Sequence, residues 1–169
     1  AAEKGSDVEM RYSWEYGSQF SASQDLQAML SGWFESGTEV IFMCGGSMFQ
    51  SGTAAAGAND GDIIGVDVDQ SGQSDTVVTS AMKDLAGSTM DVIAADYADK
   101  WADFGGKVTV FGAEHDAVGL PTDTWSLENW SVDDYNALFE KVKSGEIEIS
   151  NKEVADPSTI EWEHVTFVS

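Results

Sequence analysis

Apolar residues recur at every second position in some segments of the chain and at every third or fourth position in others. The alternation across residues 8–14 predicts a strand. The next segment has the spacing of an amphipathic helix that stops at Gly37, and its apolar stripe consists of Leu26, Met29, Leu30, Trp33 and Phe34. Residues 39–44 predict a strand buried on both faces, residues 48–58 a helix of small residues, and residues 62–67 a second apolar strand.

The second half of the chain continues this succession. Strands are predicted over residues 76–79, 107–111, 146–149 and 164–168. A long helix ended by Gly105 and Gly106 is expected after the first of these strands, with a stripe of Leu85, Val92, Ile93, Tyr97 and Trp101. Pro121 and its polar neighbours predict a loop, and Ser131 is expected to cap a last helix that closes at Gly145.

Strands that alternate with helices indicate an α/β fold, here a three-layer α/β/α sandwich around a mostly parallel sheet. We expect a single domain over residues 1–169, with residues 150–169 as a C-terminal extension. Ligands of such sheets bind beyond the carboxyl ends of the strands, so functional residues are sought in the loops 15–20, 45–47, 67–70 and 79–83.

The net charge of the chain narrows the classes of molecule that it can bind. Eight Lys and Arg stand against 30 Asp and Glu, a formal charge of −22, which repels nucleic acid and anionic lipid surfaces. The single cysteine, Cys44, lies in an apolar run and is expected to be buried. His115 and His164 have no partners at metal-ligand spacing, so we expect neither a metal site nor a cofactor. The chain contains no run of apolar residues approaching the roughly 20 of a membrane helix, and it is expected to be soluble.

Two residues at the strand ends suit a polar ligand. Asp67 directly follows the predicted strand, where a carboxylate can accept two hydrogen bonds from a vicinal diol; capping of the next turn is an equal alternative. Asp69 is expected to face solvent. Lys83 lies at the entrance of the long helix, where it can donate to a bound polar group or pair with an acid, or remain a solvated surface lysine.

Two further candidates are Gly46 and Phe20. Gly46 lies between a buried strand and a helix, where a ligand can approach the backbone N–H groups; a tight structural turn explains the same residues. The segment lacks the G-x-G-x-x-G spacing and the lysine of a phosphate loop, so dinucleotide or triphosphate binding is not supported. Phe20 lies in a polar loop, where its ring can stack on a flat ligand or cover the core.

Several segments together resemble the basic membrane protein (BMP) family, the nucleoside-binding lipoproteins of bacterial ABC transporters, which have the class-I periplasmic-binding-protein fold. The resemblance runs over about residues 8–149. It rests on residues 17–20, 37–42 with 45–47, 64–70, 79–83, 118–121 and 143–147, in the family's order and spacing.

The resemblance implies that this chain is one lobe, the C-terminal half, of a two-lobed receptor that binds a nucleoside, with a purine nucleoside expected, for uptake. It implies that Asp67 takes the ribose hydroxyls, Lys83 donates to the sugar, Gly46 offers backbone contacts and Phe20 borders the base. Expected partners are the transporter permease and the other, N-terminal lobe, and the full-length protein is expected outside the cytoplasm, lipid-anchored to the bacterial membrane. With half the pocket absent, we expect the isolated chain to bind nucleosides weakly or not at all, and its exposed surfaces to favour self-association.

The sequence alone leaves three alternative functions open. A signalling receiver domain also carries an acid, a Thr or Ser and a Lys at strand ends, but it needs an acidic pair after the first strand, where this chain has Trp14, Glu15 and Tyr16. An enzyme with Asp67 as base and Lys83 as acid or nucleophile would need shifted pKa values, which nothing in the sequence indicates, so we expect no enzyme. A sugar or autoinducer receptor of the same fold is the third.

Overall fold

The computed structural model describes residues 5–150, 152 and 154–168, and contacts between Cα atoms divide the chain into two compact units. The smaller unit joins the two chain ends, Ala1–Gln19 and Ile149–Ser169. In it, β1 (Val8–Met10) pairs in parallel with β6 (Val165–Phe167), so the strand expected over residues 164–168 is confirmed and that over residues 8–14 is shorter than predicted. The single domain expected over residues 1–169, with its extension from 150, stays a prediction.

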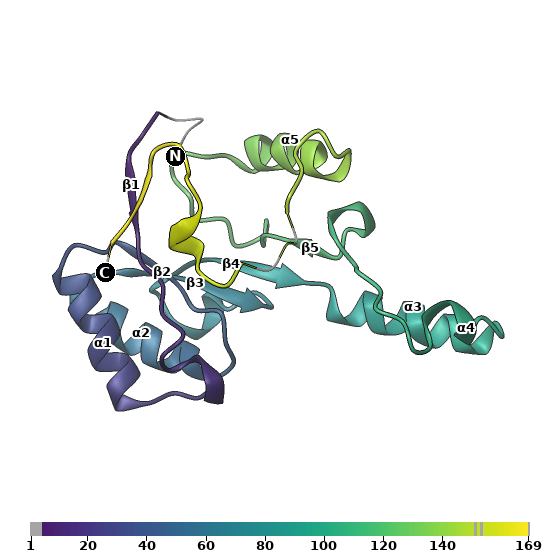
Figure 1. Cartoon of the computed structure of the whole chain (residues 1–169), viewed down its shortest axis with the longest axis horizontal. Coiled ribbons are helices and arrows are strands. Elements are labelled where there is room, and N and C mark those ends of the chain that lie inside the picture. Colours follow the sequence, from purple (N-terminus) through teal and green to yellow (C-terminus); the bar gives the residue numbers. More distant parts are fainter. Residues whose placement is uncertain (1–4, 151, 153, 169) are drawn as a thin grey trace. The chain divides into compact units, whose positions relative to one another are not determined.

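The larger unit, Phe20–Glu148, is built on a four-stranded sheet of order β2-β3-β4-β5. β2 (Val40–Phe42), β3 (Asp62–Asp67) and β4 (Val77–Lys83) are parallel, and the short β5 (Val118–Gly119) is antiparallel to the end of β4. Figure 1 shows α1 and α2 on one side of this sheet and α5 on the other. The predicted α/β fold with a mostly parallel sheet is therefore confirmed.

Helices α1 (Gln24–Glu35) and α2 (Met48–Asn59) supply most of the core on their side of the sheet. Ser23 caps α1 by accepting a hydrogen bond from the Leu26 N–H, and Leu26, Leu30 and Phe34 of the predicted stripe are buried. α2 packs closely because its residues are small: Ala55 and Ala56 are fully buried, and a Cβ on Gly52 would lie 2.6 Å from Met43 Cγ. Ile63 of β3 is the largest apolar side chain that is completely enclosed.

Helix α5 (Val132–Lys143) begins with the predicted cap. The Ser131 side chain accepts from the Asp134 N–H, and the Asp134 carboxylate accepts from the Ser131 N–H in return. An aromatic cluster then fixes the helix beside β5: the Tyr135 ring lies between Trp130 and Phe139, and its hydroxyl accepts from the Leu120 N–H at 3.0 Å. The helix thereby forms a wall next to the ends of β3 and β4.

Several predicted elements are different in the structure. The long helix is two helices, α3 (Leu85–Tyr97) and α4 (Trp101–Phe104), because the chain turns at Asp99 with a positive φ of 57°. No strand is found in residues 107–111 or 146–149, whose apolar positions have no neighbouring strand in the part of the chain that the structure describes. Short 3-10 helices complete the chain, at Gly17–Gln19, Ser71–Gln73, Ala113–His115 and Pro157–Thr159.

Two predictions of burial are also wrong, one for the two faces of β2 and one for Cys44 after it. Val40 and Phe42 are about half exposed and only Ile41 between them is buried, so one face of β2 is open. Cys44 is exposed as well, because it follows the strand at the sheet edge and its side chain is not part of the core between sheet and helices. An apolar run alone does not say whether both faces of a strand are covered.

Candidate functional site

Asp67 and Lys83 form an ion pair at the carboxyl ends of two neighbouring strands. Each is the last residue of its strand, and in the parallel register Asp67 lies opposite Met82. Lys83 Nζ donates to Asp67 Oδ1 at 2.8 Å, with both side chains about half exposed. The hydrogen bond to Asp67 is the main reason why the pKa of Lys83 lies above its usual value; burial opposes this shift and the charges of Asp67 and Cys44 add to it.

Phe20 and Gly46 meet at the end of β2. The Phe20 carbonyl accepts from the Ser47 N–H at 3.0 Å, and a Cβ on Gly46 would lie 2.8 Å from that carbonyl oxygen. Gly46 also has a positive φ of 44°, so this turn requires glycine. The Phe20 ring lies beside Gly45, since a Cβ there would be 3.2 Å from Phe20 Cδ1, and the ring is 61% exposed.

The two pairs lie at the same edge of the sheet. The Met43 N–H donates to the Ile64 carbonyl at 3.0 Å, which extends the pairing of β2 with β3 up to the turn that contains Gly46. Cys44, which follows Met43, lies near enough to Lys83 to be among the causes that raise the pKa of that lysine. The structure thus brings Asp67 and Lys83 into contact, brings Phe20 and Gly46 into contact, and sets both pairs at the carboxyl edge, as the sequence predicted.

The loop after Asp67 is held by hydrogen bonds. Asp67 itself has a positive φ of 68°, and the chain then turns so that the Gln70 side chain accepts from the Val66 N–H at 2.9 Å. The Gln70 N–H donates to the Oγ of Ser80, which is fully buried, at 3.1 Å. These bonds hold the backbone of the loop on either side of Asp67.

The structure corrects the expectation that Asp69 faces solvent. It is partly buried, with one carboxylate oxygen accepting from the Ser71 N–H at 3.0 Å and the other from Thr124 Oγ1 at 2.7 Å. These bonds, the Ser71 backbone first and Thr124 second, hold the pKa of Asp69 below its usual value. Asp69 therefore stabilises the loop that carries Asp67.

A cavity of about 580 Å³ opens beside Asp67 and Lys83, on the side of α5. Its lining combines carboxylates with apolar and aromatic side chains, and it includes Asp67, Val68, Asp69, Met82, Lys83, Asp84, Asp116, Val118, Leu120, Tyr135, Asn136, Phe139 and Glu140. Sequence reasoning missed the α5 wall, because no motif places that helix beside β3 and β4. Phe20 and Gly46 do not line this cavity, whereas Asp67 and Lys83 do.

A mostly parallel α/β sheet with polar groups around an open cavity at its carboxyl edge is an arrangement in which α/β proteins commonly bind ligands. Two solved structures have this fold. One, a solute-binding protein of an ABC transporter system from Aeropyrum pernix, has a TM-score of 0.67 and 20% identity over 91% of this chain and 51% of that one. The other, of the same kind from Conexibacter woesei, has a TM-score of 0.54 and 22% identity over 76% of this chain and 43% of that one.

Residues 3–153 match the family model of the PnrA-like substrate-binding proteins of ABC transporters, also called Bmp. The chain belongs to this family, and it has the periplasmic-binding-protein fold of its structural neighbours. It spans about half the length of the two solved structures. The match does not favour the receiver-domain alternative.

Two further properties concern the described residues. None of their helices combines the length and the apolar character that crossing a bilayer requires. They also contain no group of three or more His, Cys, Asp or Glu side chains placed to hold a metal ion.

Proposed function

We propose that this chain is a ligand-binding lobe of an ABC transporter receptor and that its ligand is a nucleoside, a purine nucleoside by preference. The observation that carries the proposal is the Asp67–Lys83 pair, two side chains 2.8 Å apart at the rim of the cavity. A ribose offers two adjacent hydroxyls, which are donors and acceptors at once, and a carboxylate beside an ammonium complements both.

The ion pair leaves room for such a ligand. Lys83 donates to Oδ1 of Asp67, so one ribose hydroxyl can donate to Oδ2 while the other replaces or bridges the lysine contact. Lys83 keeps further donors for the ring oxygen or the second hydroxyl. The backbone at Gly46 can approach the ligand closely, and the exposed ring of Phe20 can cover one face of the base.

The role is binding for transport rather than catalysis. The family supplies the substrate-binding component of ABC transporters, so the partners of the whole protein are a small-molecule substrate and a permease. We place that protein outside the cytoplasm, anchored by lipid to the bacterial membrane. The chain corresponds to the C-terminal lobe of a two-lobed receptor, and a second lobe covers the other half of the ligand.

Binding can be tested by NMR titration of the ¹⁵N-labelled chain with adenosine, guanosine, inosine and uridine. We expect weak binding, with shifts in the amides around Asp67, Lys83 and Gly46. The matched ligand is 2′,3′-dideoxyadenosine, which keeps the base and lacks the diol. Equal shifts with adenosine and its dideoxy analogue would show that the two ribose hydroxyls do not contribute to binding, which would contradict this part of the proposal.

The matched variants are Asp67→Asn and Asp75→Asn. Asp67→Asn keeps the shape and removes the charge, and it should weaken adenosine binding by at least about tenfold, the loss expected for a hydrogen bond to a charged group. Asp75 is an exposed residue just before the start of β4, and its substitution should leave binding unchanged. Unchanged binding by the Asp67→Asn chain would contradict the assigned site.

A further inference from the structure

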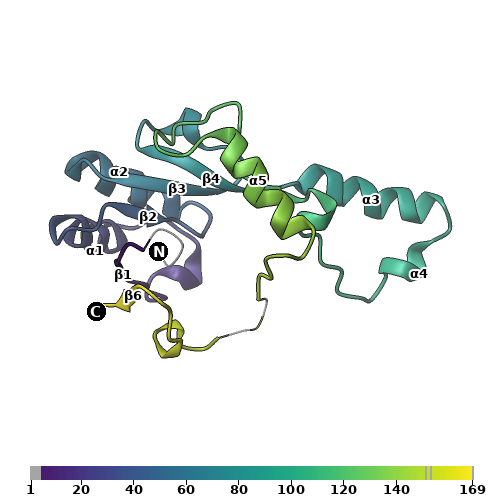
Figure 2. The ribbon, with the colours of Figure 1, turned by 90° about the horizontal axis from the view of Figure 1, so that it is seen from above.

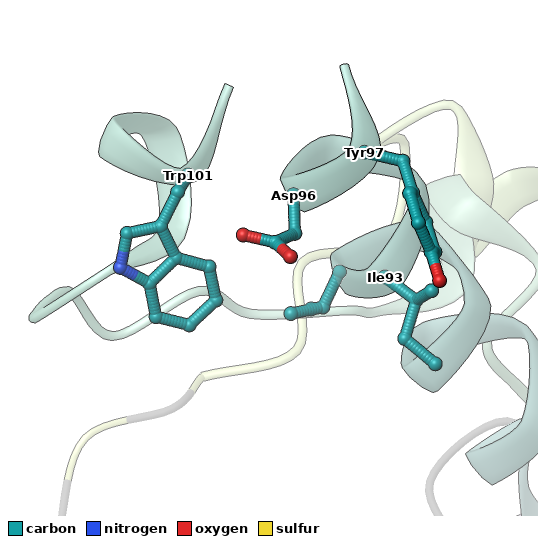
Figure 3. A pocket seen from close by; sticks show the side chains of 5 residues that line it. Ile93, Asp96, Tyr97 and Trp101 are labelled. Carbon is teal, nitrogen blue, oxygen red and sulfur yellow. The ribbon is translucent and has the colours of Figure 1, made fainter. Parts of the chain in front are cut away.

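A hollow of about 590 Å³ lies between α3 and α4, which extend away from the four-stranded sheet (Figure 2). Trp101 of α4 faces Asp96 of α3 across it, and of the five described residues that line it one, Asp96, is charged (Figure 3). The cavity beside Asp67 and Lys83 has six charged side chains in its lining. A polar ligand therefore finds more partners at the sheet, where the backbone of Asp67 has an unusual conformation.

Asp67 lies at the centre of a tight turn at the end of β3. The Val68 N–H donates to the Val66 carbonyl at 2.8 Å, which closes a turn of three residues, and Asp67 between them has a φ of 68°. A three-residue turn with a positive φ at its centre is rare and strained. Such a conformation persists only where its surroundings hold it, and strain observed at a candidate ligand residue points to a function.

Gln70 and Ser80 supply support for this turn. The Gln70 side chain accepts from the N–H of Val66, the first residue of the turn, at 2.9 Å, and the Gln70 N–H donates to Ser80 Oγ at 3.1 Å. Ser80 belongs to β4 and is fully buried, so this anchor is part of the sheet and not of the loop. Gln70 thus connects the turn at Asp67 to the neighbouring strand through both its side chain and its backbone.

Gly65 leaves the space that this connection needs. A Cβ at this position would lie 2.5 Å from Gln70 Oε1 and 2.8 Å from Ser80 Oγ, and both distances are too short for a real Cβ. Any larger residue would therefore force the Gln70 side chain to move away from the sheet. The glycine in β3 is explained by the packing of Gln70 against Ser80, since its own φ is not positive.

We propose that Gln70 and Ser80 are positioning residues for the ligand carboxylate: they hold the strained turn, and the turn directs the Asp67 side chain toward Lys83 and the cavity. Neither Gln70 nor Ser80 is among the residues that line the cavity, so they act through Asp67. Relaxation of Asp67 to a negative φ would change the direction of its Cβ and separate its carboxylate from Lys83, which now lies at 2.8 Å. The inference rests on the proposed function in one respect, that Asp67 contacts the ligand.

NMR titration of the full chain with adenosine and with 2′,3′-dideoxyadenosine tests the positioning role. Gln70→Met removes the acceptor at nearly the same side-chain length, and Gln70→Glu keeps an acceptor. Gln70→Met should weaken adenosine binding by roughly tenfold, the loss expected for Asp67→Asn itself, and should leave dideoxyadenosine binding unchanged, because only the diol meets the carboxylate. Gln70→Glu should retain most of the adenosine affinity. A Gln70→Met chain that binds adenosine as the parent does, or that loses both ligands equally, would overturn the inference.

A double-mutant cycle shows whether Gln70 acts through Asp67. In the Asp67→Asn chain, the further change Gln70→Met should cause no additional loss of adenosine affinity, because the carboxylate that it positions is already gone. Gln73→Met is the matched control, since Gln73 is an exposed glutamine in the same loop, and it should bind both ligands as the parent chain does. Additive losses would contradict a positioning role.

A measurement without ligand separates this inference from the proposed function, and it decides the inference where a chain binds too weakly to titrate. The hydrogen bond to Asp67 is the main cause that raises the pKa of Lys83, so this pKa should fall toward its usual value in Gln70→Met and stay raised in Gln70→Glu and Gln73→Met. NMR of the lysine side chain measures it, and circular dichroism verifies folding. An unchanged Lys83 pKa in Gln70→Met overturns the positioning role. A lowered pKa, in a chain whose parent binds adenosine and its dideoxy analogue equally, supports that role and contradicts the ribose contact of the proposed function.

Discussion

Thr124 Oγ1 donates a 2.7 Å hydrogen bond to Asp69, a residue 55 positions earlier in the chain. Asp69 belongs to the loop that carries Asp67, and Thr124 to the segment that leads into α5. The bond therefore connects the strand end that bears the candidate ligand carboxylate to the segment that precedes the opposite wall of the cavity.

Replacement of Thr124 by Val should lower the free energy of unfolding at neutral pH by about 1 kcal/mol, because it removes a hydrogen bond to a charged group that is only partly buried. The measurement is urea unfolding followed by tryptophan fluorescence. Thr122→Val is the control, since Thr122 is an exposed neighbour in the same loop. Equal effects of the two substitutions would contradict the assigned role of this bond.

The same pair predicts a pH dependence. The pKa of Asp69 is lowered in the folded chain, so its contribution to stability is present above the unfolded pKa of about 3.9 and is lost as pH falls through the folded value. The stability difference between the parent chain and Thr124→Val should accordingly be largest near neutral pH and shrink in acid. Unfolding curves recorded at a series of pH values measure it, and a difference that grows in acid would have the wrong sign.

Gly46→Ala should destabilise the turn after β2. The added Cβ would meet the Phe20 carbonyl at 2.8 Å, and the residue would keep a φ of 44°. We expect a loss of about 1–3 kcal/mol in urea unfolding, the cost of a strained backbone position. Gly72→Ala is the matched control, because nothing lies within 4 Å of its Cβ and its φ is not positive. A Gly46→Ala chain as stable as Gly72→Ala would show that the turn is looser than described.

Cys44 should react completely with Ellman's reagent in the native chain, because its side chain is exposed. The chain has one cysteine, so the absorbance reports this position alone. The reaction in denaturant gives the reference for full accessibility. A thiol that reacts only after unfolding would show that Cys44 is buried, as its apolar neighbours in the sequence predicted.

Added NaCl should stabilise the fold. At −22 the carboxylates repel one another, and raising the salt from about 0.1 M to about 1 M shortens the screening length from about 10 Å to about 3 Å. We expect the urea midpoint to rise, although exposed pairs such as Asp67–Lys83 weaken, because the acids far outnumber the bases. A midpoint that falls with salt would mean that the ion pairs outweigh the repulsion.

Local patterns were sufficient for much of this protein. Ser131 caps its helix as predicted, because a short polar side chain precedes an apolar stripe, and β3 has the predicted bounds because its apolar run lies between Gly61 and the acidic residues from Asp67 onward. The succession of strands and helices predicted the parallel sheet. In the structure Asp67 and Lys83 lie at one edge because both end neighbouring parallel strands, whereas the strand predicted over residues 76–79 ended before Lys83 and left it at the entrance of a helix.

Other features depended on what packs against what. Periodicity predicted one helix where the structure has α3 and α4, and it predicted a strand over residues 107–111 that the structure does not have. Whether such segments are covered depends on neighbouring elements, which a sequence pattern does not identify. The α5 wall of the cavity and the Asp69–Thr124 bond join residues far apart along the chain. Spacing along a polypeptide determines which face of an element is apolar, whereas only the folded chain determines what that face meets, because burial is a property of surfaces brought together in space.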